Sequence, residues 1–433
     1  MPTLDDPVDV GSLTLPNRLY RAPLLECAGN GDGAVDTLIQ DLEPGAATGA
    51  GLLCQGATIV RGEGGCAAPG MTRVHDPEFV AELERLTGRI HEHGSHIFCQ
   101  LEHGGLRSME TWHAGYRAEH PALDQLAVSR PPWQLRLLDR LGFLDFSPHV
   151  LSTREVRELA RDFAVAGARA IDAGYDGVHV AGANMGIVQQ FLSPFYNRRD
   201  DEFADGVRFL ELVHDEFRDR AGDAPLVTKV PVETPSPPVV RRRIDGDDAV
   251  VIAERLAEIG YDALAPVETS VVWDMSIVRG EYPARAWGES SLQPAYHEAF
   301  GGRFRTEAVK LGNRVESLFY GFEPAWNADV ARRIRDAVDV PVMLEGGIRE
   351  RGRIDRLLGE SCDLVGMARP FYAEPRLPAR LLGDVPDTTG ALCENCNNCT
   401  VPQVTDEPGR CRTPSVVRER ARRERDGEYE TGR

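Results

Sequence analysis

The feature that most constrains the fold is a series of eight short apolar runs rich in β-forming residues. They are Arg18–Ala22, Gly51–Ile59, His96–Leu101, Gly177–Ala181, Leu226–Val230, Ala263–Val267, Val340–Leu344 and Leu364–Met367. They lack strict apolar–polar alternation, which is typical of strands buried on both faces in a parallel sheet. Eight such runs with helical segments between them favour an α/β fold, a closed (β/α)8 barrel, over an open sheet.

The segments between the runs fall into two kinds. Helical periodicity is present in Ser152–Ala173, Val207–Arg220, Ala249–Ile259, Asn327–Ala337 and Arg353–Leu358. Two other connections, Glu102 to about Leu151 and Glu268 to about Pro324, are too long for simple turns. Loops after strands build the active site of such barrels, so we expect these insertions to cover it. The mostly charged residues after Arg412 are expected to form a solvated helix or a frayed tail.

The charge balance argues against several classes of protein. Asp and Glu total 68 and Lys and Arg total 49, so the formal net charge is −19. Such a surface repels nucleic-acid phosphates and anionic lipids, so we expect neither nucleic acid nor membrane as a partner. No secretory leader is visible, so we expect a cytoplasmic protein. Only Lys229 and Lys310 are lysines. This acidic, arginine-rich composition favours adaptation to high salt over the alternative, a soluble and colloidally stable protein without such adaptation.

Four of the nine cysteines lie close together near the end of the chain, at Cys393, Cys396, Cys399 and Cys411. Their spacing is C-x2-C-x2-C-x11-C, and three cysteines in one tight run with a remote fourth suit an iron–sulfur cluster. Zinc is the alternative, although zinc sites usually present two separated C-x2-C pairs. A metal-free, reduced state is the remaining alternative.

Glycine-rich loops follow the last two predicted strands. Gly346 and Gly347 follow the seventh strand, and Ala368 and Arg369 follow the eighth. These two loops form the usual phosphate site of (β/α)8 barrels, where backbone N–H groups approach closely and an arginine can bind bidentately. Simple turn glycines are the alternative, but two such loops together favour a phosphate-bearing cofactor. No G-x-G-x-x-G opens a helix, so a Rossmann domain is not expected.

Several pieces at the strand ends resemble the Old Yellow Enzyme family of FMN oxidoreductases, and the cysteine segment resembles its iron–sulfur branch. The resemblance extends from Asn17 to Cys411, and its order and spacing make it specific. The matching pieces are Asn17–Pro23, Gln100–Gly105, Ala173–Val178, Gln190–Pro194 with Asn197–Glu202, Gly346–Ile348 and Ala368–Arg369.

The resemblance implies an FMN site and a 4Fe–4S cluster ligated by the four clustered cysteines. Gln100 would hydrogen-bond the pyrimidine edge of the flavin, and Lys229 stands where the family usually has an arginine beside flavin N1. The other implied FMN residues, at the flavin edge and the phosphate, are Pro23, Leu24, Ala57, Gly346, Gly347, Ala368 and Arg369. The implied division is an FMN-binding barrel over 1–385, a cluster segment over 386–415 and a charged tail over 416–433. We expect the C-terminal nucleotide-binding half of the multidomain relatives to be missing.

The chain also departs from the family pattern. The family places His, or His and Asn, after the fourth strand to bind the substrate's carbonyl oxygen, and these positions read Ala181 and Asn184. Gly186 occupies the position of the family's usual tyrosine proton donor. Leu25 occupies the position of the Thr or Cys that touches the flavin in the family. Asn184 can still donate a hydrogen bond. Asp274 is a candidate replacement acid or base, with a solvated surface Asp as the alternative.

The resemblance therefore implies an FMN- and 4Fe–4S-dependent oxidoreductase. NAD(P)H or an electron-transfer protein would be its redox partner, and an enoyl or dienoyl compound or an amine its small-molecule substrate. A flavin electron carrier or redox sensor with little substrate turnover is the alternative. A further alternative is a barrel without flavin that is stabilised by a structural zinc ion. Homo-oligomerisation is left open.

Overall fold

The computed structural model describes residues 2–430 apart from 63–64, 67, 69, 109–114, 116–117, 119–124, 145, 236–239 and 273–274. Eight parallel strands form its central sheet, and each overlaps one predicted run. They are β3 (Leu19–Arg21), β4 (Leu52–Ile59), β5 (His96–Glu102), β8 (Gly177–Val180), β9 (Leu226–Glu233), β10 (Ala263–Thr269), β11 (Met343–Leu344) and β12 (Leu364–Met367). Their order is β10-β9-β8-β5-β4-β3-β12-β11, and a parallel bridge between Leu264 and Val342 closes the ring. The predicted (β/α)8 barrel is confirmed.

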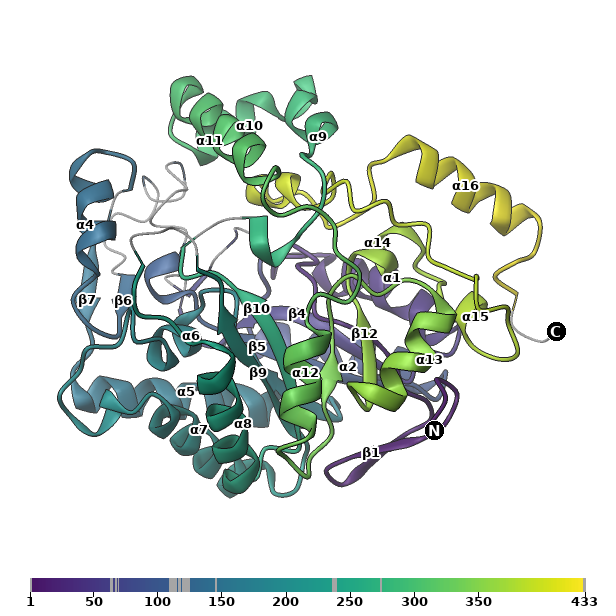
Figure 1. Ribbon diagram of the computed structural model, residues 1–433, viewed down its shortest axis with the longest axis horizontal. Helices are drawn as coiled ribbons and strands as arrows, with labels where there is room; N and C mark the ends of the chain where they lie inside the picture. The colour runs from purple at the N-terminus through teal and green to yellow at the C-terminus, as the bar shows by residue number, and fades with distance from the viewer. Residues whose placement is uncertain are drawn as a thin grey trace.

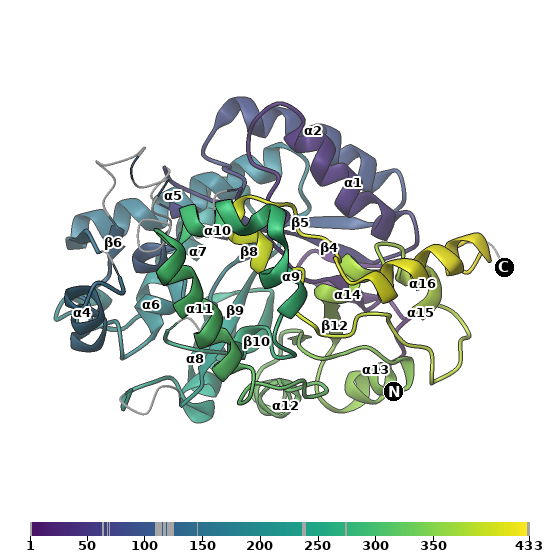
Figure 2. The same ribbon diagram turned by 90° about the horizontal axis from the view of Figure 1, so that it is seen from above.

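Helices surround this barrel, as the view from above shows (Figure 2). They are α1 (Ala34–Ala46), α2 (Pro77–His91), α5 (Thr153–Asp172), α7 (Val207–Ala221), α8 (Gly246–Ile259), α12 (Ala328–Arg335) and α13 (Arg351–Glu360). Helix α5 shows how the sequence specifies them: Ser152 and Glu155 form a capping box at its start. Its apolar face packs on α7, where the rings of Phe163 and Phe209 meet edge-on at 5.9 Å.

Large side chains fill the amino-terminal end of the barrel. A Cβ atom on Gly366 would lie 2.2 Å from the ring of Tyr20, and one on Gly177 would lie 2.5 Å from the ring of Phe98. The two glycines therefore make room for two fully buried aromatic side chains. The hairpin of β1 (Val8–Val10) and β2 (Leu13–Leu15) packs against this interior. Space for a ligand consequently lies at the carboxyl ends of the strands.

The insertions and the cysteine segment lie at that carboxyl end (Figure 1). The first insertion holds the short helix η2 (Gly105–Arg107), β6 (Gln125–Ala127), α4 (Trp133–Arg140) and β7 (Pro148–Val150). The short helix α6 (Ile187–Leu192) follows β8. The second insertion holds α9 (Ala284–Gly288), α10 (Gln293–Ala299) and α11 (Arg303–Glu316). The chain then ends through α14 (Arg369–Ala373), α15 (Pro378–Leu381), the cysteine segment and α16 (Pro414–Arg425). Among the described helices, none is long and apolar enough to cross a membrane.

Candidate active site

A cavity of about 1130 Å³ lies at the carboxyl ends of the strands. All nine residues predicted to bind the cofactor line it, and they come from six of the eight strand ends: Pro23, Leu24, Ala57, Gln100, Lys229, Gly346, Gly347, Ala368 and Arg369. Asn184 lines it as well. Typical small-molecule pockets measure roughly 300–1,000 Å³, so this cavity has room for a cofactor and a substrate together.

The loop after β11 has the geometry of an anion cradle. Gly346 and Gly347 have φ angles of +105° and +68°. Cβ atoms on them would lie 2.7 Å from the ring of Trp326 and 2.3 Å from the backbone oxygen of Glu323. The backbone N–H groups of both glycines donate no hydrogen bond to any described residue. Because unpaired N–H groups in such turns attract anions, the loop fits a phosphate.

Arg349, which the sequence analysis did not single out, follows this loop and lines the same cavity. Its guanidinium carbon lies 4.3 Å from the ring centroid of Phe322. Its Nε and Nη2 atoms are buried and have no hydrogen-bond partner among the described residues, and burial lowers the pKa of the group. Orphaned buried donors are rare in folded proteins, so Arg349 is a second candidate for binding a phosphate. Its position directly after Gly-Gly-Ile was the signal available in the sequence.

Arg369 connects the cavity to the cysteine segment. It lines both the large cavity and the small pocket between the four cysteines. Its guanidinium donates hydrogen bonds to the side-chain oxygen of Asn397 and, at 3.1 Å, to the backbone oxygen of Arg279. The predicted phosphate ligand is therefore also a structural link between the two sites.

Gln100 and Lys229 each have a partner that the sequence did not reveal. The amide Nε2 of Gln100 lies 3.0 Å from Nδ1 of His179, whose pKa is held well below its usual value by burial. The ammonium of Lys229 donates to a carboxylate oxygen of Glu345 at 2.8 Å. Since Glu345 also lines the cavity, the predicted cation at the flavin belongs to a buried ion pair.

A buried ion pair fixes the strand ends that carry Pro23–Leu24 and Ala57. Arg21, which is 1% exposed, donates to Glu26 at 2.8 Å. The same carboxylate accepts the backbone N–H of Gly56 at 2.9 Å. One side chain thus ties the end of β3 to the irregular end of β4, and residues from both ends line the cavity.

The loop after β8, where the family pattern is lost, is held in a strained conformation. Asn184 and Met185 both have a φ of +65°, which non-glycine residues rarely adopt. Arg107 donates to the backbone oxygen of Asn184. The side chains of Gln189 and Gln190 bind the N–H and the C=O of Met185 at 2.6 and 2.8 Å. Strain that is held in place by so many contacts is typical of functional sites.

Glu102 is a second residue that the sequence analysis did not single out. Its side chain is buried, lines the cavity, and belongs to the same strand as Gln100, two residues later. A Cβ atom on Gly186 would lie 3.2 Å from its Oε1 atom. Asp274, the predicted replacement acid, lies outside the described residues. The available signal for Glu102 was its place at the end of the third barrel strand.

The four clustered cysteines line one small pocket. Burial raises the pKa of the Cys399 thiol to about 12 and also raises that of Cys411. Among the described residues, no three His, Cys, Asp or Glu side chains are close enough to bind one metal ion together. The chain thus brings all four predicted ligands to one pocket.

Asparagines shape the loop between these cysteines. Asn395 and Asn397 have φ angles of +54° and +56°, which asparagine tolerates better than most residues. The amide of Asn397 donates to the backbone oxygen of Glu281 at 3.1 Å. Asn398 accepts the backbone N–H of Ala286 at 3.1 Å. These contacts attach the cysteine loop to the second insertion.

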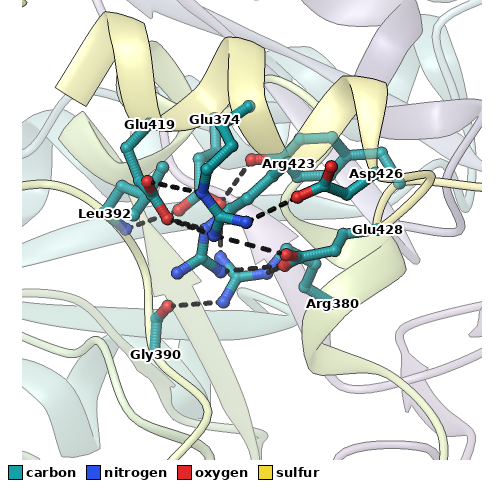
Figure 3. A network of polar contacts seen from close by, with 10 residues as sticks. Glu374, Arg380, Gly390, Leu392, Glu419, Arg423, Asp426 and Glu428 are labelled. Carbon is teal, nitrogen blue, oxygen red and sulfur yellow. Dashed lines mark hydrogen bonds and ion pairs between the residues drawn. The ribbon is translucent and has the colours of Figure 1, made fainter.

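A network of charged side chains anchors the start of the same loop (Figure 3). Glu374 is completely buried and binds both Arg380 and the backbone N–H of Leu392, which precedes Cys393. Tyr429 donates its hydroxyl to Glu374 at 2.8 Å, and burial raises the pKa of this phenol. The segment after α16 therefore packs on the scaffold of the cysteine loop.

Comparison with known proteins gives one family. The model of the NADH:flavin oxidoreductase / NADH oxidase family matches residues 3–289. A metal reductase of Desulforamulus reducens is 26% identical over 400 residues, which are 92% of this chain and 51% of the relative. The chain thus spans about half the length of this curated relative. A 4,4'-dithiodibutanoate disulfide reductase of Rhodococcus erythropolis is 26% identical over 439 residues, or 97% and 98% of the two chains.

Solved structures share the fold. The Old Yellow Enzyme homologue of Zymomonas mobilis superposes with a TM-score of 0.62 at 18% identity and covers 96% of this chain and 98% of its own. A 2-naphthoyl-CoA reductase gives a TM-score of 0.72 at 16% identity and covers 99% and 58%. At these identities the likeness concerns the barrel and the elements placed on it.

Proposed function

The chain belongs to the NADH:flavin oxidoreductase / NADH oxidase family, and on this premise we propose that it is an FMN- and 4Fe–4S-dependent oxidoreductase. It would pass hydride or electrons between NAD(P)H and a small organic substrate, either an activated alkene or an amine. The observation that carries the proposal is the convergence of nine predicted cofactor residues from six strand ends on one large cavity.

The residues of the cavity fit FMN. The unpaired N–H groups of Gly346 and Gly347 and the unpaired donors of Arg349 would hold the phosphate. Gln100, oriented by a neutral His179, would bind the pyrimidine edge. Lys229 would stabilise negative charge at that edge, and bound flavin would supply hydride transfer. The role of the chain is to orient the ring system and to exclude water.

The spacing of the four cysteines favours a cluster over zinc. Zinc sites usually present two separated C-x2-C pairs, whereas this chain has three cysteines in one tight run and a remote fourth. That arrangement suits an iron–sulfur cluster. Arg369 would couple the cluster mechanically to the flavin site, because it lines both pockets. We therefore propose that residues 386–415 form the cluster segment.

An electron carrier with little substrate turnover is the second candidate. It is favoured by one observation, the replacement of the usual oxygen-binding and proton-donating side chains by Ala181 and Gly186. Turnover separates the two: a carrier would exchange electrons with NAD(P)H or a protein partner and reduce no alkene and oxidise no amine. For either function we propose that the protein works in the cytoplasm of a cell with a high internal salt concentration. The formal net charge of −19 supports this proposal.

Anaerobic purification tests the cofactors. We expect one FMN and about four irons per chain, and faster reduction by one of NADH and NADPH. Cys396→Ala should remove most of the iron, whereas Cys362→Ala, a buried cysteine outside the loop, should retain it. A protein without flavin would end the proposal, and one that binds zinc and FMN would remove the cluster from it.

A further inference from the structure

We infer that Glu102 is the acid–base residue of the cavity, in place of the histidine and tyrosine that the chain lacks. The inference rests on the proposed function, since it concerns proton transfer that accompanies hydride transfer in the same cavity. The group that transfers the proton would thus lie at the end of β5, whereas the family has it in the loop after β8.

The position of Glu102 is the first argument. Residues two apart on a strand point to the same face, so Glu102 follows Gln100 along the wall of the cavity. Both side chains line it, and Glu102 is 7% exposed. Its carboxylate accepts no hydrogen bond and forms no ion pair with any described residue. Because Glu102 lines the cavity, its oxygens are available to a group that enters there, with Arg107 and Lys229 acting on them as nearby charges.

Gly186 leaves space for the carboxyl group of Glu102. This glycine is the counterpart of the family's tyrosine, and its missing Cβ atom would lie 3.2 Å from Oε1 of Glu102. Any larger side chain at this position would therefore compete with the carboxyl group for the same volume. The chain thus has Gly186 after β8, where the family has a tyrosine, and Glu102 at the end of β5. The carboxyl group of Glu102 would take over the proton transfer that the tyrosine performs in the family.

Burial and two nearby cations act on Glu102 in opposite directions. Burial raises the pKa of its carboxyl group, while Arg107 from η2 and Lys229 from β9 oppose the rise. The group is thus easier to protonate than an exposed glutamate, yet two cations can stabilise its carboxylate once the proton has left. Arg107 also holds the backbone oxygen of Asn184, so it acts as a positioning residue for both walls.

Reduction of an activated alkene adds one hydride and one proton across its double bond. One alkene carbon receives a hydride, with two electrons, from the reduced flavin. The other receives the proton of Glu102. One carbon–carbon π bond breaks and two C–H bonds form, and the carboxylate regains a proton from water. NAD(P)H restores the two electrons. In this direction Glu102 must start protonated, so the rate is constant at low pH and falls about tenfold per pH unit above the pKa of the group.

The first test needs no substrate and compares the wild type with Glu102→Gln. The midpoint potential of the bound flavin is measured against pH. Negative charge on the reduced flavin raises the pKa of a facing carboxyl group, so the wild type should take up an extra proton on reduction within one pH range. Glu102→Gln should lack this uptake. Glu323→Gln removes an exposed carboxylate whose partner is Arg279, and should match the wild type.

The second test uses 2-cyclohexen-1-one as the probe. Glu102→Gln should slow its reduction by the pre-reduced enzyme about 100-fold and abolish the fall at high pH, with flavin reduction by NAD(P)H within about twofold of the wild type. Glu102→Asp should recover most of the rate. Superimposable potential curves for wild type and Glu102→Gln overturn the inference, whereas a wild type that binds no FMN overturns the proposed function instead. A wild type that binds FMN but does not reduce the probe leaves the potential curves to decide.

Discussion

The cavity has two walls that present different kinds of chemical group. The phosphate wall consists of Gly346, Gly347, Ala368 and Arg369, and it presents mainly backbone groups. The substrate wall consists of Glu102, Arg107, Asn184 and Met185, with Gly186 beside Glu102, and it presents side chains and one strained loop. The phosphate wall keeps the pattern of the Old Yellow Enzyme family, while the substrate wall departs from it. The difference suggests that backbone geometry is what the proposed cofactor site preserves, whereas the side chains of the proposed substrate site are the part that is exchanged.

The largest expected effect on FMN binding is on the phosphate wall. Gly347→Ala places a Cβ atom 2.3 Å from the backbone oxygen of Glu323 at a φ of +68°. The left-handed conformation alone costs about 1–2 kcal/mol, and the backbone clash adds to it. We expect purified Gly347→Ala to bind FMN more than tenfold more weakly, as measured by fluorescence titration of the apoprotein.

Gly88→Ala is the matched control for this substitution. Gly88 lies in α2, and a Cβ atom there meets nothing within 4 Å. Alanine should leave FMN affinity unchanged and stabilise the fold by about 0.5–1 kcal/mol. Unchanged FMN affinity in Gly347→Ala would show that the loop adapts to the added Cβ atom. It would contradict the prediction that FMN binding depends on a fixed backbone geometry in the phosphate wall.

The sequence placed the residues of the phosphate wall at the cavity for a physical reason, while their binding of a phosphate stays a prediction. Parallel strands buried on both faces leave continuous apolar runs, and turns with positive φ require glycine, so both are visible as residue types. The substrate wall depends on side chains from separate loops, such as Glu102 beside Gly186. The pairing of Lys229 with Glu345, 116 residues later, is equally invisible in the sequence. Asp274 remains a prediction, because it lies outside the described residues.

A medium effect is expected where the two walls meet, at Lys229. Its ammonium is shared with Glu345 at 2.8 Å, and the family usually has arginine here. Guanidinium spreads its charge and stabilises a nearby anion less locally than ammonium. Lys229→Arg should keep FMN bound and lower the flavin midpoint potential by about 15–30 mV, the equivalent of about 0.7–1.4 kcal/mol for two electrons.

Lys310→Arg controls for the exchange itself. Lys310 lies on α11, where it binds Gln293 and Glu307, and it does not line the cavity. Its replacement should leave the potential unchanged. Equal potentials in all three proteins, measured by dye equilibration, would show that the cation at this position does not face the flavin.

The smallest effect is expected from the same kind of substitution on the substrate wall. Gly186 has a φ of −63°, which alanine adopts without strain. Its Cβ atom would first meet Oε1 of Glu102 at 3.2 Å, the far end of a flexible side chain rather than backbone. Gly186→Ala should therefore keep FMN affinity and change the free energy of unfolding by less than about 0.5 kcal/mol. Because it displaces the carboxyl group slightly, alkene reduction should slow about two- to fivefold. If Gly186→Ala instead lost FMN as completely as Gly347→Ala, both walls would be equally rigid. The division between backbone recognition and exchangeable side chains would then fail.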